Sequence, residues 1–463
     1  MSKLPPVIIG AGPAGLACAA AFLEANIRPV IVEETSRPGG QGTRRLSPLM
    51  ASKIERLMGQ TGARAIAKRE ADEDRILAAC DWRPGSLVWG IYDNQLEVLR
   101  DRKHESLPYG QLMIATGATD RIMAFPGWTL PGVFSLGGAQ VALKQHAAFI
   151  GSRIVLAGSS PLLYLTAVQY LRMGVRNLIV IDSTASPNKF RAAMGMALSA
   201  PSTFIEGLRL LHELRRAGLR RIEGATLLRA NGQSRIEAVE IRHPSGQTET
   251  LECDALAFGY GLRPETQLAE LAGARFRFDP SLRNWFPIID DDGCADSDLW
   301  LAGDGAITGG RVAAARSGRL AALSMIAARS DNAGMWDDGR AALRRSVKRF
   351  RRFQIHMADA FRWPHELAAT LPDETIVCRC ERVSAADIRT AIAQAAGPVE
   401  INRVKAITRC GMGRCQGRFC SQTLQELTAS TSGQPVEAVG RLRSQAPVRP
   451  IPIGSACSEG TRA

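Results

Sequence analysis

The sequence predicts an α/β protein with two dinucleotide-binding, Rossmann-like domains and a small C-terminal domain that is rich in cysteine. Three observations lead to this prediction. A buried strand, a glycine-rich turn and a small-residue helix follow one another at residues 7–26. The same order of elements recurs at residues 152–174. Half of the ten cysteines lie between residues 378 and 420.

The composition is typical of a folded, soluble protein. The chain has 463 residues, of which 45% are hydrophobic and 22% charged. This length is enough for about two to four domains. No apolar run approaches the ~20 residues of a membrane span, so a spanning segment is not expected, whereas association with a membrane surface stays open.

The first residues, "MSKLPPVIIGAG", enter a strand almost at once and lack the pattern of a signal peptide. We therefore expect a cytoplasmic protein. Because disulfides are rare in that compartment, clustered cysteines favour metal or redox chemistry.

The net charge of +13 raises the question of nucleic acid binding. The basic residues are spread along the chain, with one local excess at 340–352, and no nucleic-acid-binding motif accompanies them. Apolar Leu343, Val347 and Phe350 recur there at helical spacing, which predicts an amphipathic helix. We interpret its basic face as solvated, with contact to a partner protein as the alternative. No nucleic acid partner is expected.

The first glycine-rich turn has the features of a dinucleotide site. Gly10, Gly12 and Gly15 match G-x-G-x-x-G between a strand and a helix. Gly10 permits a tight turn, Gly12 admits a pyrophosphate, and Gly15 allows close packing of helix and strand. A second strand ends in Glu33, where a carboxylate can bind ribose hydroxyls.

Three later segments indicate which dinucleotide is bound. They are "RPGGQ" at 37–41, "LMIATGA" at 112–118 and "LWLAGDGA" at 299–306. In this order they resemble the flavoproteins with two dinucleotide-binding domains of the thioredoxin-reductase-like type. The resemblance implies FAD, with Asp304 at a ribityl hydroxyl and the following helix directed at the flavin ring. The predicted cofactor-binding residues are Gly10, Gly12, Pro13, Ala14, Gly15, Glu33, Glu34, Gly40, Gln41, Ala115, Thr116, Gly117, Gly303, Asp304 and Ala313.

The second glycine-rich turn departs from the pattern. Gly158 is present, but Ser160 and Leu162 replace the second and third glycines, and a side chain at 160 would crowd a pyrophosphate. In the family this domain binds NAD(P)H. Three interpretations stay open: a retained scaffold, an altered site for ATP or another adenine nucleotide, and a working NAD(P)H site.

The sequence offers no catalytic residue beyond these motifs. Cys18, Cys80, Cys253 and Cys294 form no C-x-x-C pair and are interpreted as small buried residues. The six histidines do not cluster. A substrate site within this chain is therefore not predicted.

The C-terminal cysteines are spaced as ligands of an iron–sulfur cluster. Cys378 and Cys380 stand one residue apart, and Cys410, Cys415 and Cys420 lie in a glycine-rich loop. Zinc is the rival for four thiolates, but C-x-C with C-x₄-C is unusual for zinc. Between the two groups, a helix is predicted to begin after Ser384 and to end at Gly397.

The stretch 373–432 resembles the bacterioferritin-associated-ferredoxin-like [2Fe–2S] domain, in the form fused to flavoprotein subunits. The resemblance assigns the cluster to Cys378, Cys380, Cys415 and Cys420. Cys410 is then a fifth thiol that ligates no iron.

The resemblance extends over nearly the whole chain, to the alpha subunits of bacterial heteromeric amino- and imino-acid dehydrogenases. That group includes the corresponding subunits of opine oxidase, of hydrogen cyanide synthase and of the proline and hydroxyproline dehydrogenases. It implies a partner beta flavoprotein that oxidises the C–N bond, and leaves open a small ferredoxin-like subunit. Electrons would pass through the cluster and this chain's FAD to an acceptor. The alternatives are a self-contained NAD(P)H-dependent reductase and a non-enzymatic redox sensor.

The predicted organisation follows from these assignments. The FAD domain comprises 1–118 and 266–330, the second dinucleotide-like domain 119–265, a helical connector 331–372, the [2Fe–2S] domain 373–432 and a tail 433–463.

Overall fold

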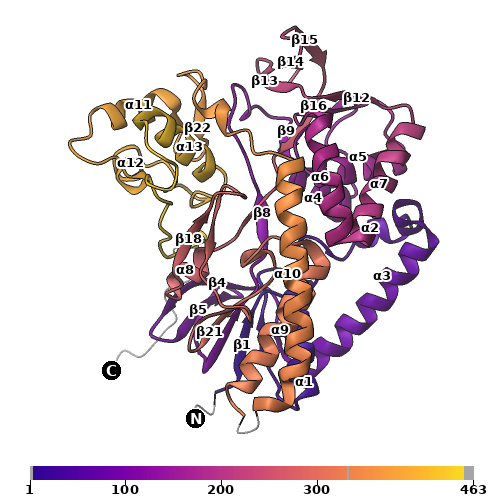
Figure 1. Cartoon of the computed structure of the whole chain (residues 1–463), viewed down its shortest axis with the longest axis vertical. Coiled ribbons are helices and arrows are strands. Elements are labelled where there is room, and N and C mark those ends of the chain that lie inside the picture. Colours follow the sequence, from indigo (N-terminus) through magenta and orange to yellow (C-terminus); the bar gives the residue numbers. More distant parts are fainter. Residues whose placement is uncertain (1–3, 331–332, 453–463) are drawn as a thin grey trace.

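The computed structural model describes residues 4–330 and 333–452, and two parallel sheets organise most of them (Figure 1). The first sheet has the order β20-β21-β7-β1-β2-β3, in which all neighbours are parallel except β20 and β21. Its strands are β1 (Pro6–Ile9), β2 (Val30–Val32), β3 (Asp81–Arg83), β7 (Gln111–Ile114), β20 (Cys294–Asp296) and β21 (Leu299–Leu301). Because β21 pairs with β7, the chain returns to this sheet after passing through the second one.

The second sheet is parallel throughout, in the order β12-β11-β10-β16-β9. Its strands are β9 (Val133–Ser135), β10 (Ile154–Gly158), β11 (Leu178–Asp182), β12 (Arg220–Glu223) and β16 (Ala255–Gly259). The central strands are fully buried apolar runs, as expected where helices cover both faces of a parallel sheet.

Smaller sheets connect and cover these two. The two crossings between the halves pair with each other as β8 (Ala118–Asp120) and β17 (Leu262–Pro264). The three-stranded sheets are β4 (Ser86–Tyr92), β5 (Gln95–Arg100) and β6 (Lys103–Pro108), and β13 (Thr226–Asn231), β14 (Ala238–Arg242) and β15 (Thr248–Glu252). The remaining pairs are β18 (Phe276–Asp279) with β19 (Asn284–Pro287), and β22 (Ile376–Cys378) with β23 (Val383–Ser384).

The helices of the two halves lie around the sheets. They are α1 (Pro13–Glu24), α2 (Pro48–Ala51), α3 (Ile54–Ala79), α4 (Leu136–His146), α5 (Pro161–Arg172), α6 (Ser186–Ser199), α7 (Pro201–Arg216), α8 (Gln267–Leu271) and α9 (Gly310–Ala327). Short 3₁₀ turns occur at η1 (Gly303–Gly305), η2 (Ala333–Trp336) and η3 (His365–Ala368).

The predicted basic helix is α10 (Asp337–Ala360), the long orange helix that runs beside α9 and α6 in Figure 1. Its basic face is not simply solvated. Arg340 and Arg344 pair with Asp292, and Lys348 pairs with Asp291 at 2.6 Å. Arg345, Arg349 and Arg352 are exposed. The interpretation of the whole face as solvated was therefore wrong, because half of its charge ties the connector to the first half of the chain.

The cysteine-rich domain consists of β22, β23, α11 (Ala385–Ala393), α12 (Ile401–Thr408) and α13 (Ser421–Ser432). Ser384 and Asp387 form the expected capping box at the start of α11. The helix ends at Ala393, with Gln394 as its C-cap, so the predicted end at Gly397 was too late.

Buried arginines join this domain to the two sheets. Arg121 donates to Gln422 Oε1 at 3.0 Å, and its guanidinium lies 4.0 Å from the centre of the Trp363 ring. Arg283 forms a two-pronged pair with Glu426, both bonds 2.8 Å long. Arg263 donates to the carbonyl of Gly417 and to Ser421 Oγ. These contacts give α13 a fixed position against the flavoprotein-like part.

The tail crosses back to the first half of the chain. Val448 N donates to Trp89 O at 2.9 Å, and Arg449 pairs with Glu34 at 3.2 Å. The last predicted tail residues, 453–463, lie outside the described residues.

Candidate functional site

The first glycine turn joins β1 to α1 and leaves no space for side chains at two positions. A Cβ on Gly10, where φ is +101°, would lie 2.5 Å from the Ala115 carbonyl oxygen. A Cβ on Gly15 would lie 1.9 Å from the Gly10 carbonyl oxygen. Gly15 therefore serves the close packing of helix and strand, the role that the sequence predicts for it.

Glu33, at the end of the second strand, is buried and holds this turn. Its Oε2 accepts a hydrogen bond from Ala11 N at 2.8 Å. Its Oε1 accepts from the Thr35 backbone N–H at 2.9 Å and from the Thr35 hydroxyl at 2.7 Å. The carboxylate thus fixes the loop in addition to its predicted contact with ribose, and sequence spacing did not reveal the part that Thr35 plays.

A cavity of ≈ 590 Å³ opens in front of the turn. All but two of the predicted cofactor residues line it: Gly15 is behind the turn, and Ala314 takes the place predicted for Ala313. Sequence reasoning missed the contributions of Lys144 on α4 and of Val448 and Arg449 in the tail.

Asp304 lines the cavity from the turn η1. Its Oδ1 accepts hydrogen bonds from Gly309 N at 2.7 Å and Gly310 N at 2.9 Å. Burial raises the pKa of its carboxyl. The helix predicted directly after Asp304 begins six residues later, at Gly310. The side chain therefore caps α9 from a distance and holds the positive end of that helix at the cavity.

The second glycine turn is occupied by the chain's own residues. Ser159 Oγ donates to the Arg362 carbonyl at 2.8 Å. Asp182, where a ribose-binding acid would stand, is fully buried and binds Lys189 at 2.5 Å and the Tyr164 hydroxyl. A nucleotide would have to displace these contacts. We therefore interpret the domain as a retained scaffold.

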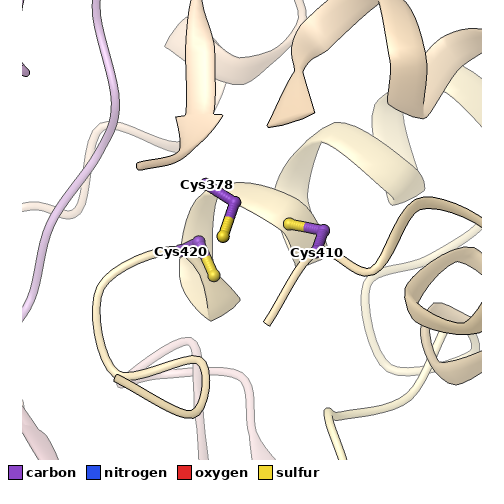
Figure 2. Close-up of side chains that lie close together, drawn as sticks. All are labelled: Cys378, Cys410 and Cys420. Atoms are coloured by element: carbon purple, nitrogen blue, oxygen red, sulfur yellow. The ribbon is translucent and has the colours of Figure 1, made fainter. Parts of the chain in front are cut away.

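Three cysteine thiols converge in the C-terminal domain (Figure 2). The sulfurs of Cys378, Cys410 and Cys420 all lie within 4.8 Å of one another, and all three residues are buried. Hydrogen bonds from the Cys410 and Cys420 thiols lower the pKa of the Cys378 thiol to about 2. Such an arrangement stabilises thiolate, the form that binds iron.

The remaining two cysteines of the cluster group lie beside each other. Cys380 and Cys415 form a hydrogen bond, and both are half-buried. Gly413 lies close behind them, because a Cβ there would stand 2.3 Å from Cys380 Cβ. The fold thus gathers all five thiols, more than a cluster requires. The assignment to Cys378, Cys380, Cys415 and Cys420 stays a prediction, since the buried Cys410 adjoins two of these residues.

The loop between Cys415 and Cys420 reaches the cavity. Arg418 and Phe419 line it, and Arg418 pairs with Glu265, another lining residue, at 2.7 Å. The cysteine group and the cavity in front of the glycine turn therefore share a wall.

Residues 5–322 match the family model "pyridine nucleotide-disulphide oxidoreductase". The chain belongs to this family. Residues 376–430 match the BFD-like [2Fe–2S] binding domain. The matches confirm the predicted fold class: two dinucleotide-binding domains of this flavoprotein type and a small [2Fe–2S] domain. They also give the chain its two cofactors, FAD and a [2Fe–2S] cluster, and the glycine cradle and convergent thiols fit them.

Two full-length relatives confirm the resemblance that the sequence indicated. The A-type subunit of opine oxidase from Agrobacterium tumefaciens (strain Ach5) is 34% identical, covering 96% of this chain and 90% of that protein. The HcnB subunit of hydrogen cyanide synthase from Pseudomonas aeruginosa is 33% identical, covering 100% of both chains. The solved structure of L-proline dehydrogenase from P. horikoshii is 18% identical with a TM-score of 0.68, covering 98% of this chain and 79% of that one. This likeness shows the shared fold.

Among the described residues, none of the helices combines the length and the apolar character that crossing a membrane requires.

Replacement of Glu33 by Ala should weaken FAD retention on the order of 10- to 100-fold, because it removes charge-assisted hydrogen bonds worth ~1.5–3 kcal/mol. FAD affinity is measured by titration of the flavin-free chain, with the exposed Glu55→Ala as control. Unchanged FAD affinity in Glu33→Ala would contradict the ribose assignment.

Serine at Cys378, Cys380, Cys415 or Cys420 should abolish or strongly destabilise the cluster, because each thiolate supplies one of four iron bonds. Cys410→Ser should retain its visible absorption and EPR signal, as should the remote control Cys294→Ser. Loss of the cluster in Cys410→Ser with retention in Cys415→Ser or Cys420→Ser would show that the ligand set is wrong.

NADH and NADPH should not bleach the flavin at catalytic rates, because Ser160, Lys189 and the Arg362 carbonyl occupy the nucleotide position. Stopped-flow absorbance of the flavin tests this, with dithionite as the positive control. Rapid bleaching by either nucleotide would support the reductase interpretation instead.

Proposed function

We propose that this chain is the electron-transferring subunit of a heteromeric dehydrogenase that oxidises a C–N bond of an amino or imino acid. The substrate site would lie on a partner flavoprotein, and a small ferredoxin-like protein would be a further component. Two of the relatives are named as subunits of opine oxidase and hydrogen cyanide synthase, which supports a role within an assembly.

The observation that carries the proposal is the wall shared by the cluster loop and the FAD cavity. Thr116 Oγ1 donates to the Glu265 carbonyl at 2.7 Å, and Glu265 N donates to the Gly117 carbonyl at 2.9 Å. The side chain of Glu265 then binds Arg418, two residues before Cys420. A continuous set of hydrogen bonds therefore joins the predicted flavin turn to a predicted cluster ligand.

FAD supplies both one- and two-electron chemistry, and the [2Fe–2S] cluster supplies one-electron chemistry. The residues of the shared wall hold the two sites in one position relative to each other. Adjoining centres of this kind suit a protein that passes electrons between a partner and an acceptor.

The cavity offers little chemistry for oxidising an amino acid. A substrate site would need a group to bind the carboxylate and a base to accept a proton. Each acidic side chain that lines the cavity is already held by backbone N–H groups or by an arginine: Glu33, Glu34, Asp120, Glu265 and Asp304. This supports placing the oxidation on another chain.

We also propose a cytoplasmic location. All nine cysteines of the described residues are free, and five of them gather where iron would be bound. Reduced thiols and iron–sulfur chemistry are typical of that compartment.

The isolated chain should not oxidise proline, hydroxyproline, opines or glycine with an artificial electron acceptor, because it lacks a base and a carboxylate site. Co-expression with an amino-acid-oxidase-type flavoprotein from the same genome should restore dye-linked oxidation. The assay follows dye reduction with each substrate for the chain alone, the flavoprotein alone and the assembly. Substrate oxidation by the fully loaded chain alone would overturn the proposal.

A further inference from the structure

We propose that exposed arginines around the accessible edge of the cysteine group form a docking surface for an acidic electron-transfer protein. This inference rests on the proposed function and names where a one-electron partner binds and what its surface is like. The arginines are Arg379, Arg382, Arg409 and Arg414, called the edge arginines below.

The cysteine group has a buried side and an accessible side. Cys378, Cys410 and Cys420 are buried, whereas Cys380 and Cys415 are half-buried. An external electron carrier can approach a cluster in this position most closely over Cys380 and Cys415. A docking surface for one-electron exchange is therefore expected around these two residues.

The edge arginines surround these two residues. Arg379 precedes Cys380, and Arg414 precedes Cys415. Arg382 lies two residues beyond Cys380, and all of the edge arginines are exposed. Arg409 reaches the same edge, because its Nε lies 3.0 Å from the Oε2 of Glu381.

Their positive charge is only partly compensated. Glu381 pairs with Arg409. Within the described part of the chain, Arg382 and Arg414 form no ion pair. Arg379 is held by aromatic rings, with its guanidinium 4.2 Å from the centre of Phe419 and 5.7 Å from that of Trp128. A net positive rim therefore faces solvent at the accessible edge.

Arginines elsewhere in the molecule are used differently. Arg283 and Arg418 form buried pairs with Glu426 and Glu265, and Arg340 is paired on α10. Those contacts hold the fold together. The unpaired edge arginines have no comparable structural task, and their positions match those needed for a charged partner.

Charge complementarity identifies the occupant as the acidic face of a protein that carries a one-electron centre. Opposite charges on two partners raise association rates and orient the encounter, and both effects weaken with added salt. Small, transient interfaces of this kind are usual for redox partners. Arginine rather than lysine also suits a contact rich in carboxylates, because its planar group binds them in a two-pronged manner.

The test uses the full chain loaded with both cofactors and the double variant Arg382→Glu/Arg414→Glu. The matched control is Arg349→Glu/Arg352→Glu, which makes the same change of charge on exposed residues of α10. Iron content, flavin content and the EPR signal of the reduced cluster establish that each variant is intact. Arg382→Gln/Arg414→Gln serves as a milder variant if charge reversal impairs folding.

The first measurement follows oxidation of the chemically reduced cluster, by freeze-quench EPR, with ferricyanide and with hexaammineruthenium(III). Reversal at the edge should slow the anionic oxidant about tenfold at low salt and accelerate the cationic one, and high salt should reduce both effects. The α10 control should resemble the unmodified chain. Equal effects of the two double variants, or none, would overturn the docking surface.

The second measurement is equilibrium binding of an acidic plant-type ferredoxin, with basic cytochrome c as the counter-probe. Binding of the ferredoxin should be salt-sensitive and should be lost in the edge variant only. If the edge variant instead loses binding to phosphatidylglycerol vesicles while ferredoxin binding is unchanged, the surface belongs to a lipid membrane and the proposal fails. Neither measurement uses an amino-acid substrate, so failure of the proposed function is seen separately, in the dye-linked assay.

Discussion

The buried ion pair between Arg418 and Glu265 is the contact on which the functional architecture depends. The two side chains are 7% and 10% exposed and 2.7 Å apart. Taking such charges out of water is costly, and the removal of one partner alone typically destabilises a protein by ~3–5 kcal/mol. Arg418 also donates to the carbonyls of Cys415 and Val448. One guanidinium therefore connects the cluster loop, the flavin half and the tail.

The other buried arginines extend this connection along α13. Arg121, which burial makes less basic by lowering its pKa to about 9, binds Gln422 and stacks on Trp363. Arg283 binds Glu426, and Trp363 Nε1 donates to the same carboxylate at 2.9 Å. Hydrogen bonds to charged groups depend on direction, so this set specifies one orientation of the small domain. An apolar contact of equal area would fix its position less strictly.

The second dinucleotide domain shows how a fold can persist after its site has changed. Its parallel sheet and its strand–turn–helix unit are intact. The acid at the end of β11 now anchors Lys189 and Tyr164, and the connector covers the glycine turn through Arg362. The domain still has a mechanical task, because α10 packs on α6 and then leads to the cysteine-rich domain. Fold and function have thus separated within one chain.

The sequence by itself determined the local features, because their physics acts over a few residues. The Gly10–Gly15 turn, the Ser384 capping box and the nearness of Cys378 to Cys380 follow from backbone geometry and spacing. Residues far apart in sequence were beyond its reach. Only the tertiary structure brought Cys410 to Cys378, Arg418 to Glu265, Arg344 to Asp292 and the tail to the cavity. Those contacts depend on how separate elements pack, and the same local patterns are compatible with many packings.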